Sequence, residues 1–207
     1  MKYLNPTKTF LLSATAMFLV SCSNDDNGPV NEEEVITTVT TTLTTVDGQM
    51  ITLTSKDLDG VDGPNAPEFT ATRDLDGDGP NAPVIIPSGN LAANTIYSGA
   101  VTFLNETQSP AEDITVEVEE EGVDHQVFYQ LPAGLGTITY TDTDLDLNGK
   151  PIGLTFTLTT GNAGTGDLKV TLRHLPNKSA EGVATGDITN AGGATDADVS
   201  FPVNISN

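Results

Sequence analysis

The fold is decided by residues 39–54, Val39-Thr-Thr-Thr-Leu43-Thr-Thr-Val46-Asp47-Gly48-Gln-Met50-Ile-Thr-Leu-Thr54. Val39 and Leu43, and then Ile51 and Leu53, lie an even number of residues apart among Thr residues, which is the period of a β-strand with one buried and one wet face. An Asp-Gly pair between two such runs is the strongest short sequence signal for a β-hairpin. The stretch therefore predicts two antiparallel strands joined by a tight turn.

Similar short runs recur along the rest of the chain, each bounded by Gly, Pro, Asn or Asp. We expect strands near residues 95–104, 126–131, 135–141, 152–160, 168–175 and 198–205. Their apolar residues share one face and their Thr, Lys, Arg and Asp residues the other, which is typical of antiparallel sheets packed face to face. The sequence predicts a mainly β protein, an antiparallel, Ig-like β-sandwich formed by residues 35–207 as a single domain.

Residues 110–121 do not follow this pattern. Ser109-Pro110-Ala111-Glu112 has a potential N-cap, a Pro at the first helical position and a capping-box Glu, and Gly122 follows as a stop signal. These features favour a short helix. The alternation of Ile114, Val116 and Val118 favours a strand instead, because β-branched residues suit strands.

The N-terminus has the features of an export signal. Residues 1–8 carry two Lys and no acid, and residues 10–20 form an apolar run too short for a permanent membrane span. Leu19-Val20-Ser21-Cys22 resembles a bacterial lipobox, so we expect residues 1–21 to be a signal peptide and Cys22 to be lipidated. Residues 22–34 are acidic and nearly devoid of apolar side chains, which predicts a flexible tether to the outer membrane, with the domain facing the cell surface.

Composition excludes several classes of function. The chain has 29 Asp and Glu against eight Lys and Arg, a net charge of −21, and no basic cluster, so a phosphate backbone would be repelled. One Cys excludes an internal disulfide. No nucleophile elbow, zinc-protease motif or phosphate loop is present, and the chain has no Trp to form a glycan platform. We therefore do not expect an enzyme or a nucleic-acid-binding protein.

Two Asp-rich loops are nearly identical: residues 57–67 read DLDGVDGPNAP and residues 74–83 read DLDGDGPNAP. A third run of alternating acids occupies residues 142–146. Alternating carboxylates on a turning backbone are typical of Ca²⁺ loops, although none of these runs has the bidentate Glu of an EF-hand. The candidate Ca²⁺ ligands are Asp57, Asp59, Asp62, Asp74, Asp76, Asp78, Asp142, Asp144 and Asp146. The alternative is that these sequences only form turns, as Asp-Gly and Gly-Pro pairs do without any ion.

The second candidate site is a group of acids and imidazoles: Glu121, Asp124 and His125, with His174 far away in the sequence. Imidazole and carboxylate together suit Zn²⁺ or another divalent transition metal. The alternative places the Glu residues on a solvated helix end and makes His174 a hydrogen-bonded residue at the rim of the core.

Several segments resemble a family of short flavobacterial and other Bacteroidota surface lipoproteins, often labelled "type 1 periplasmic binding fold superfamily protein". They are residues 32–39, 56–60 and 91–97, the Glu-rich segment that ends at His125-Gln126, residues 172–178 and residues 186–193. The resemblance covers nearly the whole mature length and implies solute binding in outer-membrane uptake. A true type 1 binding protein is a two-lobed α/β structure, and this chain lacks both the length and the alternating helices for it.

These features together lead to two functional expectations. The first is a non-enzymatic binding module for a cation or small solute at the cell surface, accessory to a TonB-dependent outer-membrane transporter. The second is a structural or adhesive surface protein whose Asp-rich loops bind Ca²⁺ only for rigidity.

Overall fold

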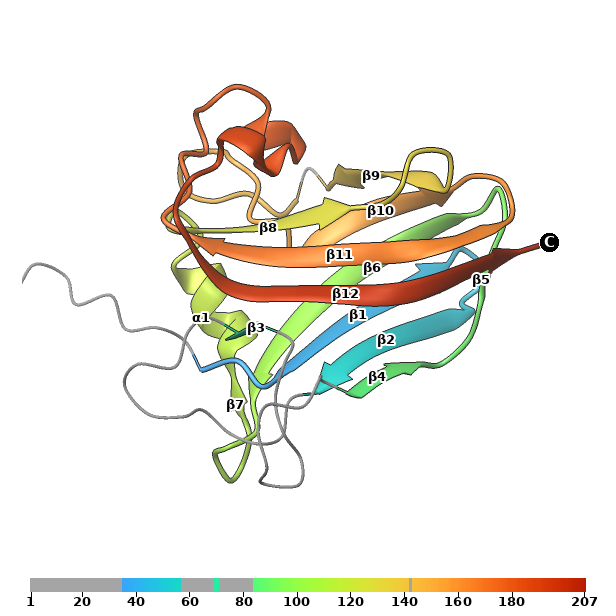
Figure 1. The fold of residues 1–207 in the computed structure, drawn as a ribbon. Coiled ribbons are helices and arrows are strands. Elements are labelled where there is room, and N and C mark those ends of the chain that lie inside the picture. The colour runs from blue at the N-terminus through green and yellow to red at the C-terminus, as the bar shows by residue number, and fades with distance from the viewer. Residues whose placement is uncertain (1–34, 57–68, 71–83, 142) are drawn as a thin grey trace, which may run out of the picture. The chain divides into compact units, whose positions relative to one another are not determined.

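The structure is a computed structural model, and it describes residues 35–56, 69–70, 84–141 and 143–207. Two sheets of this region stack face to face (Figure 1). Among the described residues, no helix is long and apolar enough to cross a membrane.

The first sheet has the strand order β4-β2-β1-β6-β10-β9. Its strands are β4 (Val84–Pro87), β2 (Met50–Lys56), β1 (Thr38–Thr45), β6 (Ile96–Asn105), β10 (Thr155–Thr160) and β9 (Gly136–Tyr140), and the short β7 (Glu112–Asp113) also pairs with β6. All these pairings are antiparallel. Strands β1 and β2 form the predicted hairpin, with Gly48 at a φ of 85° in its turn. That conformation is strained for a residue with a Cβ, which explains the Gly.

The second sheet has the order β3-β12-β11-β8. Its strands are β3 (Phe69–Thr70), β12 (Ala194–Ser206), β11 (Gly164–His174) and β8 (His125–Gln130), and β5 (Leu91–Ala92) pairs with β12 as well. The three long strands are antiparallel, whereas β3 and β5 run parallel to β12. The sequence predicted the long strands, but it gave no indication of these two short parallel additions.

The core lies between the two sheets and is apolar. Its largest fully buried side chains on the inner faces include Tyr97, Phe103, Phe156, Phe201, Leu43, Leu53, Leu158, Leu168 and Leu172. The apolar alternation predicted for residues 154–158, 168–172 and 199–205 is confirmed, because each of those apolar residues is buried. The mainly β sandwich predicted from the sequence is therefore confirmed.

One helix, α1 (Ile114–Glu120), interrupts the strands and lies at one end of the sandwich (Figure 1). It buries Ile114 and Val118 and leaves Val116 exposed. The predicted helix exists, but its N-cap is Asp113, whose side chain accepts a hydrogen bond from Thr115 N–H, and not Ser109. Glu112, taken as a capping-box residue, lies in β7 instead. The helix thus starts later than predicted, after a short strand.

The connection between β11 and β12 packs on the outer face of β8 in the second sheet. It contains two 3₁₀ turns, Val183–Thr185 and Ile188–Asn190. Val183 and Ala191 pack on Phe128 of β8 as a small second core. Gln126 of β8 donates a hydrogen bond to the Val183 carbonyl at 2.8 Å, so the connection is attached to the sheet by polar as well as apolar contacts.

Two buried Tyr residues, Tyr129 of β8 and Tyr140 of β9, form hydrogen bonds to backbone carbonyl groups on the side of the sandwich where these two strands lie. The Tyr140 hydroxyl donates to the Val127 carbonyl at 2.6 Å, and the Tyr129 hydroxyl donates to the Gly153 carbonyl at 2.7 Å. Burial raises the pKa of Tyr140 from about 10 to about 12, although a hydrogen bond from Gln126 opposes the shift. Burial also raises the pKa of Tyr129 well above its ordinary value.

A raised pKa predicts a loss of stability in alkali. The folded protein holds the Tyr140 proton more tightly than the unfolded chain, so its contribution to stability is complete below pH 10 and is lost as the pH rises to about 12. Urea unfolding should show that Tyr140→Phe lowers the free energy of unfolding by about 1 kcal/mol at pH 9. The variant should lose less further stability than the wild type between pH 10 and 11.5. Equal losses in the two proteins would contradict this role.

Candidate metal centre

Three buried side chains from three strands meet at one end of the second sheet. His125 begins β8, His174 ends β11 and lies directly opposite it, and Asp196 lies near the start of β12. His125 is fully buried, and His174 and Asp196 are each 8% exposed. One potential ligand atom from each lies within 4.8 Å of the others. We call these residues the His–His–Asp cluster.

A β-bulge brings Asp196 into this cluster. Along β12 the register with β11 shifts between the pairs Leu172↔Ala197 and Arg173↔Thr195, so Asp196 is the extra residue. An extra residue lets two consecutive side chains lie on one face, which regular alternation forbids. Asp196 and Ala197 are both buried as a result. Without the bulge, the carboxylate would point to the outer face of the sheet.

The end of helix α1 orients His125. The Nδ1 atom of His125 lies 3.2 Å from the carbonyl oxygen of Glu121, the C-cap residue. A carbonyl only accepts, so Nδ1 carries the proton and donates it to this oxygen, which also accepts from the N–H of Asp124 at 2.8 Å. The other ring nitrogen, Nε2, faces Asp196 Oδ2 at 3.8 Å. A histidine that donates through one nitrogen to a backbone carbonyl is the usual arrangement of a metal ligand.

His174 stacks on His125, with the ring centroids 4.7 Å apart and an angle of 30° between the planes. Its Nδ1 atom is buried and has no hydrogen-bond partner among the described residues. Buried polar atoms almost always have a partner, and an exception commonly marks a bound water or ion. His174 is 8% exposed at the end of β11, and no hydrogen bond to its Nδ1 is found among the described residues.

The donor set fits a transition metal better than Ca²⁺. In a tetrahedral Zn²⁺ site with bonds of about 2.0–2.1 Å, neighbouring donor atoms lie about 3.3 Å apart. The observed separations, up to 4.8 Å, would therefore shorten by up to about 1.5 Å when an ion is bound. Two imidazoles and one carboxylate suit Zn²⁺, Ni²⁺ or Cu²⁺, whereas Ca²⁺ takes six to eight oxygen ligands.

The two described acids of the third Asp-rich run, Asp144 and Asp146, use their carboxylates within the protein. Asp146 accepts hydrogen bonds from the N–H groups of Asn148 and Lys150, both at 2.8 Å, and forms an ion pair with Lys178 at 3.1 Å. Asp144 accepts from Thr155 N–H at 2.8 Å. These contacts are those of a turn and an ion pair, the alternative to an ion site for this run.

The Lys178–Asp146 ion pair is buried, with 6% and 1% of the two side chains exposed. The ammonium also donates to the carbonyl groups of Gly122 and Pro151. Burial lowers the pKa of Lys178, and the hydrogen bond to Asp146 opposes this shift. Burial alone would raise the pKa of Asp146, but the Lys150 N–H, the ammonium and the Asn148 N–H hold it below its ordinary value.

The remaining predicted site residues fall into two groups. Glu121 and Asp124 lie beside the cluster, but they contribute backbone carbonyls, to His125 and to Leu175 N–H, and the Glu121 side chain is exposed. The rest lie outside the described residues: Cys22, Asp57, Asp59, Asp62, Asp74, Asp76, Asp78 and Asp142. Their predicted roles therefore stay predictions.

Sequence reasoning brought His125 and His174 together as a candidate pair but missed Asp196. The strand was expected from residue 198, whereas β12 begins at Ala194. The segment Ala194-Thr-Asp-Ala-Asp198 reads as polar and does not alternate cleanly. Gly192-Gly193 just before it was the available signal, because paired Gly residues permit the sharp turn that precedes an irregular strand start.

Comparison with known proteins adds no relative to these observations: no protein-family model, curated protein or solved structure matches the chain.

Proposed function

We propose that the protein is a non-enzymatic, lipid-anchored binding module of the outer-membrane surface that holds one divalent transition-metal ion at the His–His–Asp cluster. The observation that carries the proposal is the burial of two imidazoles and a carboxylate within 4.8 Å of one another. Such a group is costly in an apolar core unless something compensates it, and a dication does so. The expected partner is a TonB-dependent outer-membrane transporter.

The closed position of the cluster argues for binding and against catalysis. A catalytic zinc site keeps one coordination position open to substrate. Here all three side chains are less than 9% exposed, and helix α1 ends at the residue that orients His125.

Thermal unfolding with and without metal tests this function. The mature chain, carrying Cys22→Ser to prevent lipidation and thiol binding, is stripped with chelator and scanned with Zn²⁺, Ni²⁺, Cu²⁺ or Ca²⁺. An ion that binds only the folded state, at a hundredfold excess over its Kd, stabilises by about 2.7 kcal/mol. For a domain of this size, that raises the Tm by about 5–10 °C. We expect this rise with Zn²⁺ and not with Ca²⁺.

Matched variants identify the ligands. His174→Ala and Asp196→Asn should each remove the Zn²⁺-dependent rise. Asp198→Asn is the control, because that carboxylate lies two residues away on the same strand and pairs with Lys169 at 2.8 Å. It should keep the rise. The proposal would be overturned if the Zn²⁺-dependent rise in Tm survives in both ligand variants, or if no transition metal raises the Tm of the wild type. A rise with millimolar Ca²⁺ alone, lost in Asp76→Ala, would support the stiffening role of the Asp-rich loops instead.

A further inference from the structure

The C-terminal end of helix α1 is held from two sides. On one side, the carbonyl oxygen of Glu121 lies 3.2 Å from Nδ1 of His125. On the other side, the next carbonyl along the chain, that of Gly122, accepts a hydrogen bond from the ammonium of Lys178. These two consecutive carbonyl groups therefore connect the His–His–Asp cluster to the buried Lys178–Asp146 ion pair.

The Lys178 ammonium has an acceptor for each of its three N–H donors. Besides the Gly122 carbonyl, it donates to the Asp146 carboxylate at 3.1 Å and to the Pro151 carbonyl at 3.0 Å. Asp146 and Pro151 lie between β9 and β10, Gly122 follows α1, and Lys178 itself lies between β11 and β12. The ammonium thus joins three separate segments and fixes the place where α1 ends.

The end of α1 has little room to move. Gly122 is buried, and a Cβ added to it would lie 2.5 Å from Cδ1 of Ile152. The Gly122 N–H donates to the Glu119 carbonyl at 3.2 Å, and the Asp124 N–H donates to the Glu121 carbonyl at 2.8 Å. Because these peptide groups belong to one hydrogen-bonded turn, a shift of the Gly122 carbonyl would move the Glu121 carbonyl with it.

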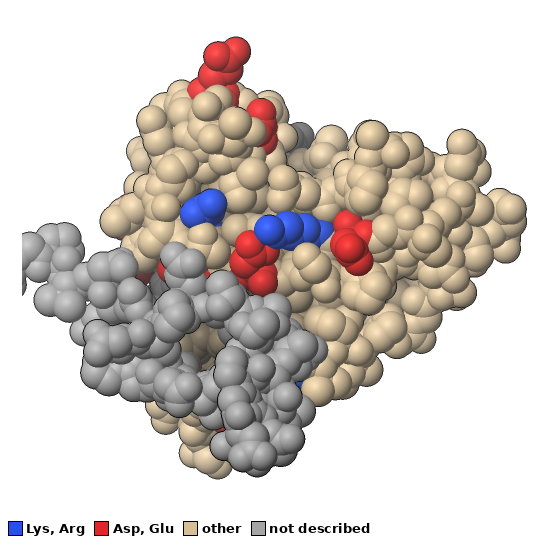
Figure 2. All heavy atoms as spheres, viewed as in Figure 1, with Lys and Arg blue, Asp and Glu red and all other residues tan. Residues whose placement is uncertain are grey.

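Among the described residues, Lys178 is the one Lys or Arg that is buried. Figure 2 shows Lys and Arg side chains at the surface, where water solvates them. A buried ion pair is weak evidence for stability, because the cost of removing two charges from water offsets their attraction, and an apolar pair of similar volume is often equally stable. An apolar pair cannot, however, donate a hydrogen bond to the Gly122 carbonyl. The contacts of the ammonium therefore indicate a role beyond stability.

We propose that Lys178 is a positioning residue of the metal centre. Its ammonium holds the Gly122 carbonyl, and the adjoining Glu121 carbonyl keeps the proton of His125 on Nδ1. Nε2 of His125, which faces Asp196, is then the atom presented to the ion. The inference rests on the proposed function for its effect on metal affinity, whereas its effect on the His125 ring is a property of the metal-free protein.

The double variant Lys178→Met/Asp146→Leu tests the proposal. It replaces the ion pair with apolar side chains and removes one charge of each sign, so the net charge is unchanged. The first readout is the ¹⁵N NMR spectrum of the metal-free mature Cys22→Ser chain at about pH 8, where an ordinary imidazole is neutral. The wild type should carry the His125 proton on Nδ1, and the double variant should carry it partly on Nε2. The second readout is the Kd for Zn²⁺, which should rise about tenfold, as for other partners that orient a ligand.

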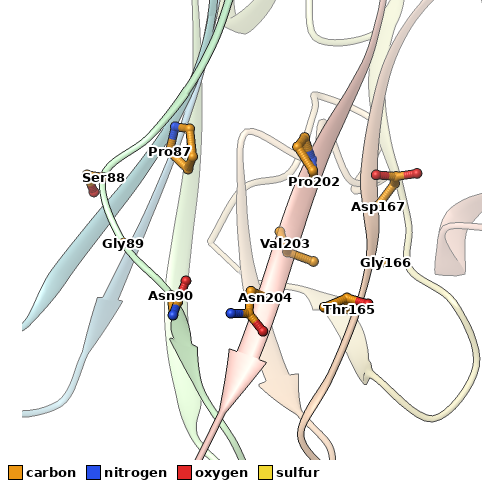
Figure 3. A pocket seen from close by; sticks show the side chains of 10 residues that line it. All are labelled: Pro87, Ser88, Gly89, Asn90, Thr165, Gly166, Asp167, Pro202, Val203 and Asn204. Carbon is orange, nitrogen blue, oxygen red and sulfur yellow. The ribbon is translucent and has the colours of Figure 1, made fainter.

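Lys169→Met/Asp198→Leu is the matched control. This ion pair joins β11 and β12 at 2.8 Å and is partly exposed. Lys169 lies two residues along β11 from Asp167, which lines the groove drawn in Figure 3. Among the described residues, neither partner has a hydrogen bond to helix α1. The control should keep both the position of the His125 proton and the Kd for Zn²⁺.

The two readouts separate this inference from the proposed function. If the wild type binds Zn²⁺ and the double variant leaves the His125 proton on Nδ1, only the positioning role is overturned. A proton that moves without a change in Kd would overturn it as well. If the wild type binds no transition metal, the proposed function fails and the positioning role fails with it. Should the double variant not fold, Lys178→Arg replaces it, because a planar guanidinium keeps the charge but cannot direct its donors as the ammonium does. The same movement of the proton is expected there, and its absence would overturn the proposal.

Discussion

Replacing Asp146 with Asn is expected to lower the free energy of unfolding by about 3–5 kcal/mol, because it leaves the buried Lys178 ammonium without its counter-charge. Asn can still accept from the N–H groups of Asn148 and Lys150 through one oxygen. Its amide nitrogen, however, is a donor and cannot bind an ammonium. The corresponding fall in Tm is about 10–15 °C.

Asp144→Asn is the matched control for this change. It removes one charge from the same loop, but that charge acts on Lys178 more weakly than the charge of Asp146 does, and Asn can also accept the hydrogen bond from Thr155 N–H. We expect a change within about 0.5 kcal/mol, as for surface substitutions. Acid titration gives a second readout. The pKa of Asp146 is lowered in the folded state, so its contribution is present above the ordinary value of 3.8 and is lost as the pH falls below it. If the two variants were equally stable, the ion pair would contribute nothing to folding.

Replacing Gly193 with Ala should both destabilise the domain and disable the His–His–Asp cluster. Gly193 has a φ of 73°, and an added Cβ would lie 2.2 Å from the carbonyl oxygen of His174. The carbonyl is backbone, so relief of the clash must move the end of β11 away from β12. We expect a loss of about 3 kcal/mol from strain and displacement together. The Zn²⁺-dependent rise in Tm should disappear, because His174 and Asp196 would separate.

Gly192→Ala is the control that separates the cost of a positive φ from the cost of the steric clash with the His174 carbonyl. Gly192 also has a positive φ, of 62°, but an added Cβ there meets nothing within 4 Å. It should cost only the left-handed conformation, about 1–2 kcal/mol, and should keep the metal response. Calorimetry of both variants, with and without Zn²⁺, measures the Tm and its Zn²⁺-dependent rise in each. An unchanged metal response in Gly193→Ala would show that the spacing of β11 and β12 does not determine the cluster.

The parts of the fold that the sequence predicted are those governed by local chemistry. Alternating apolar residues determined the long strands, and Asp47-Gly48 determined the β1–β2 hairpin. The start of α1 was misplaced because Ser109-Pro110-Ala111-Glu112 has the local signals of a helix start, whereas Glu112 pairs with Asn105 of β6 and the N-cap is Asp113. That pairing is a tertiary contact, and local sequence does not encode it.

Of the three residues of the His–His–Asp cluster, the sequence indicated the two His residues and not Asp196, for the same reason. His125 and His174 are far apart in sequence and were paired on chemistry alone, whereas their contact follows from the register of β8 and β11. Asp196 depends on a bulge, which changes the face of one residue without changing the residue types around it. The short strands β3 and β5 pair in parallel with β12, and no sequence pattern marked either of them.

The connection between β11 and β12 is flanked by two of the proposed ligands, His174 before it and Asp196 after it. This chain has a single Cys, so no disulfide can form within it. An ion held by both residues would close a loop of roughly twenty residues in the folded state, and because it binds only that state, its stabilisation is set by its Kd and its free concentration. Because His125 lies on β8, the same ion would also link β8 to β11 and β12. The cluster would thus give the domain a reversible cross-link that depends on metal supply and not on oxidation.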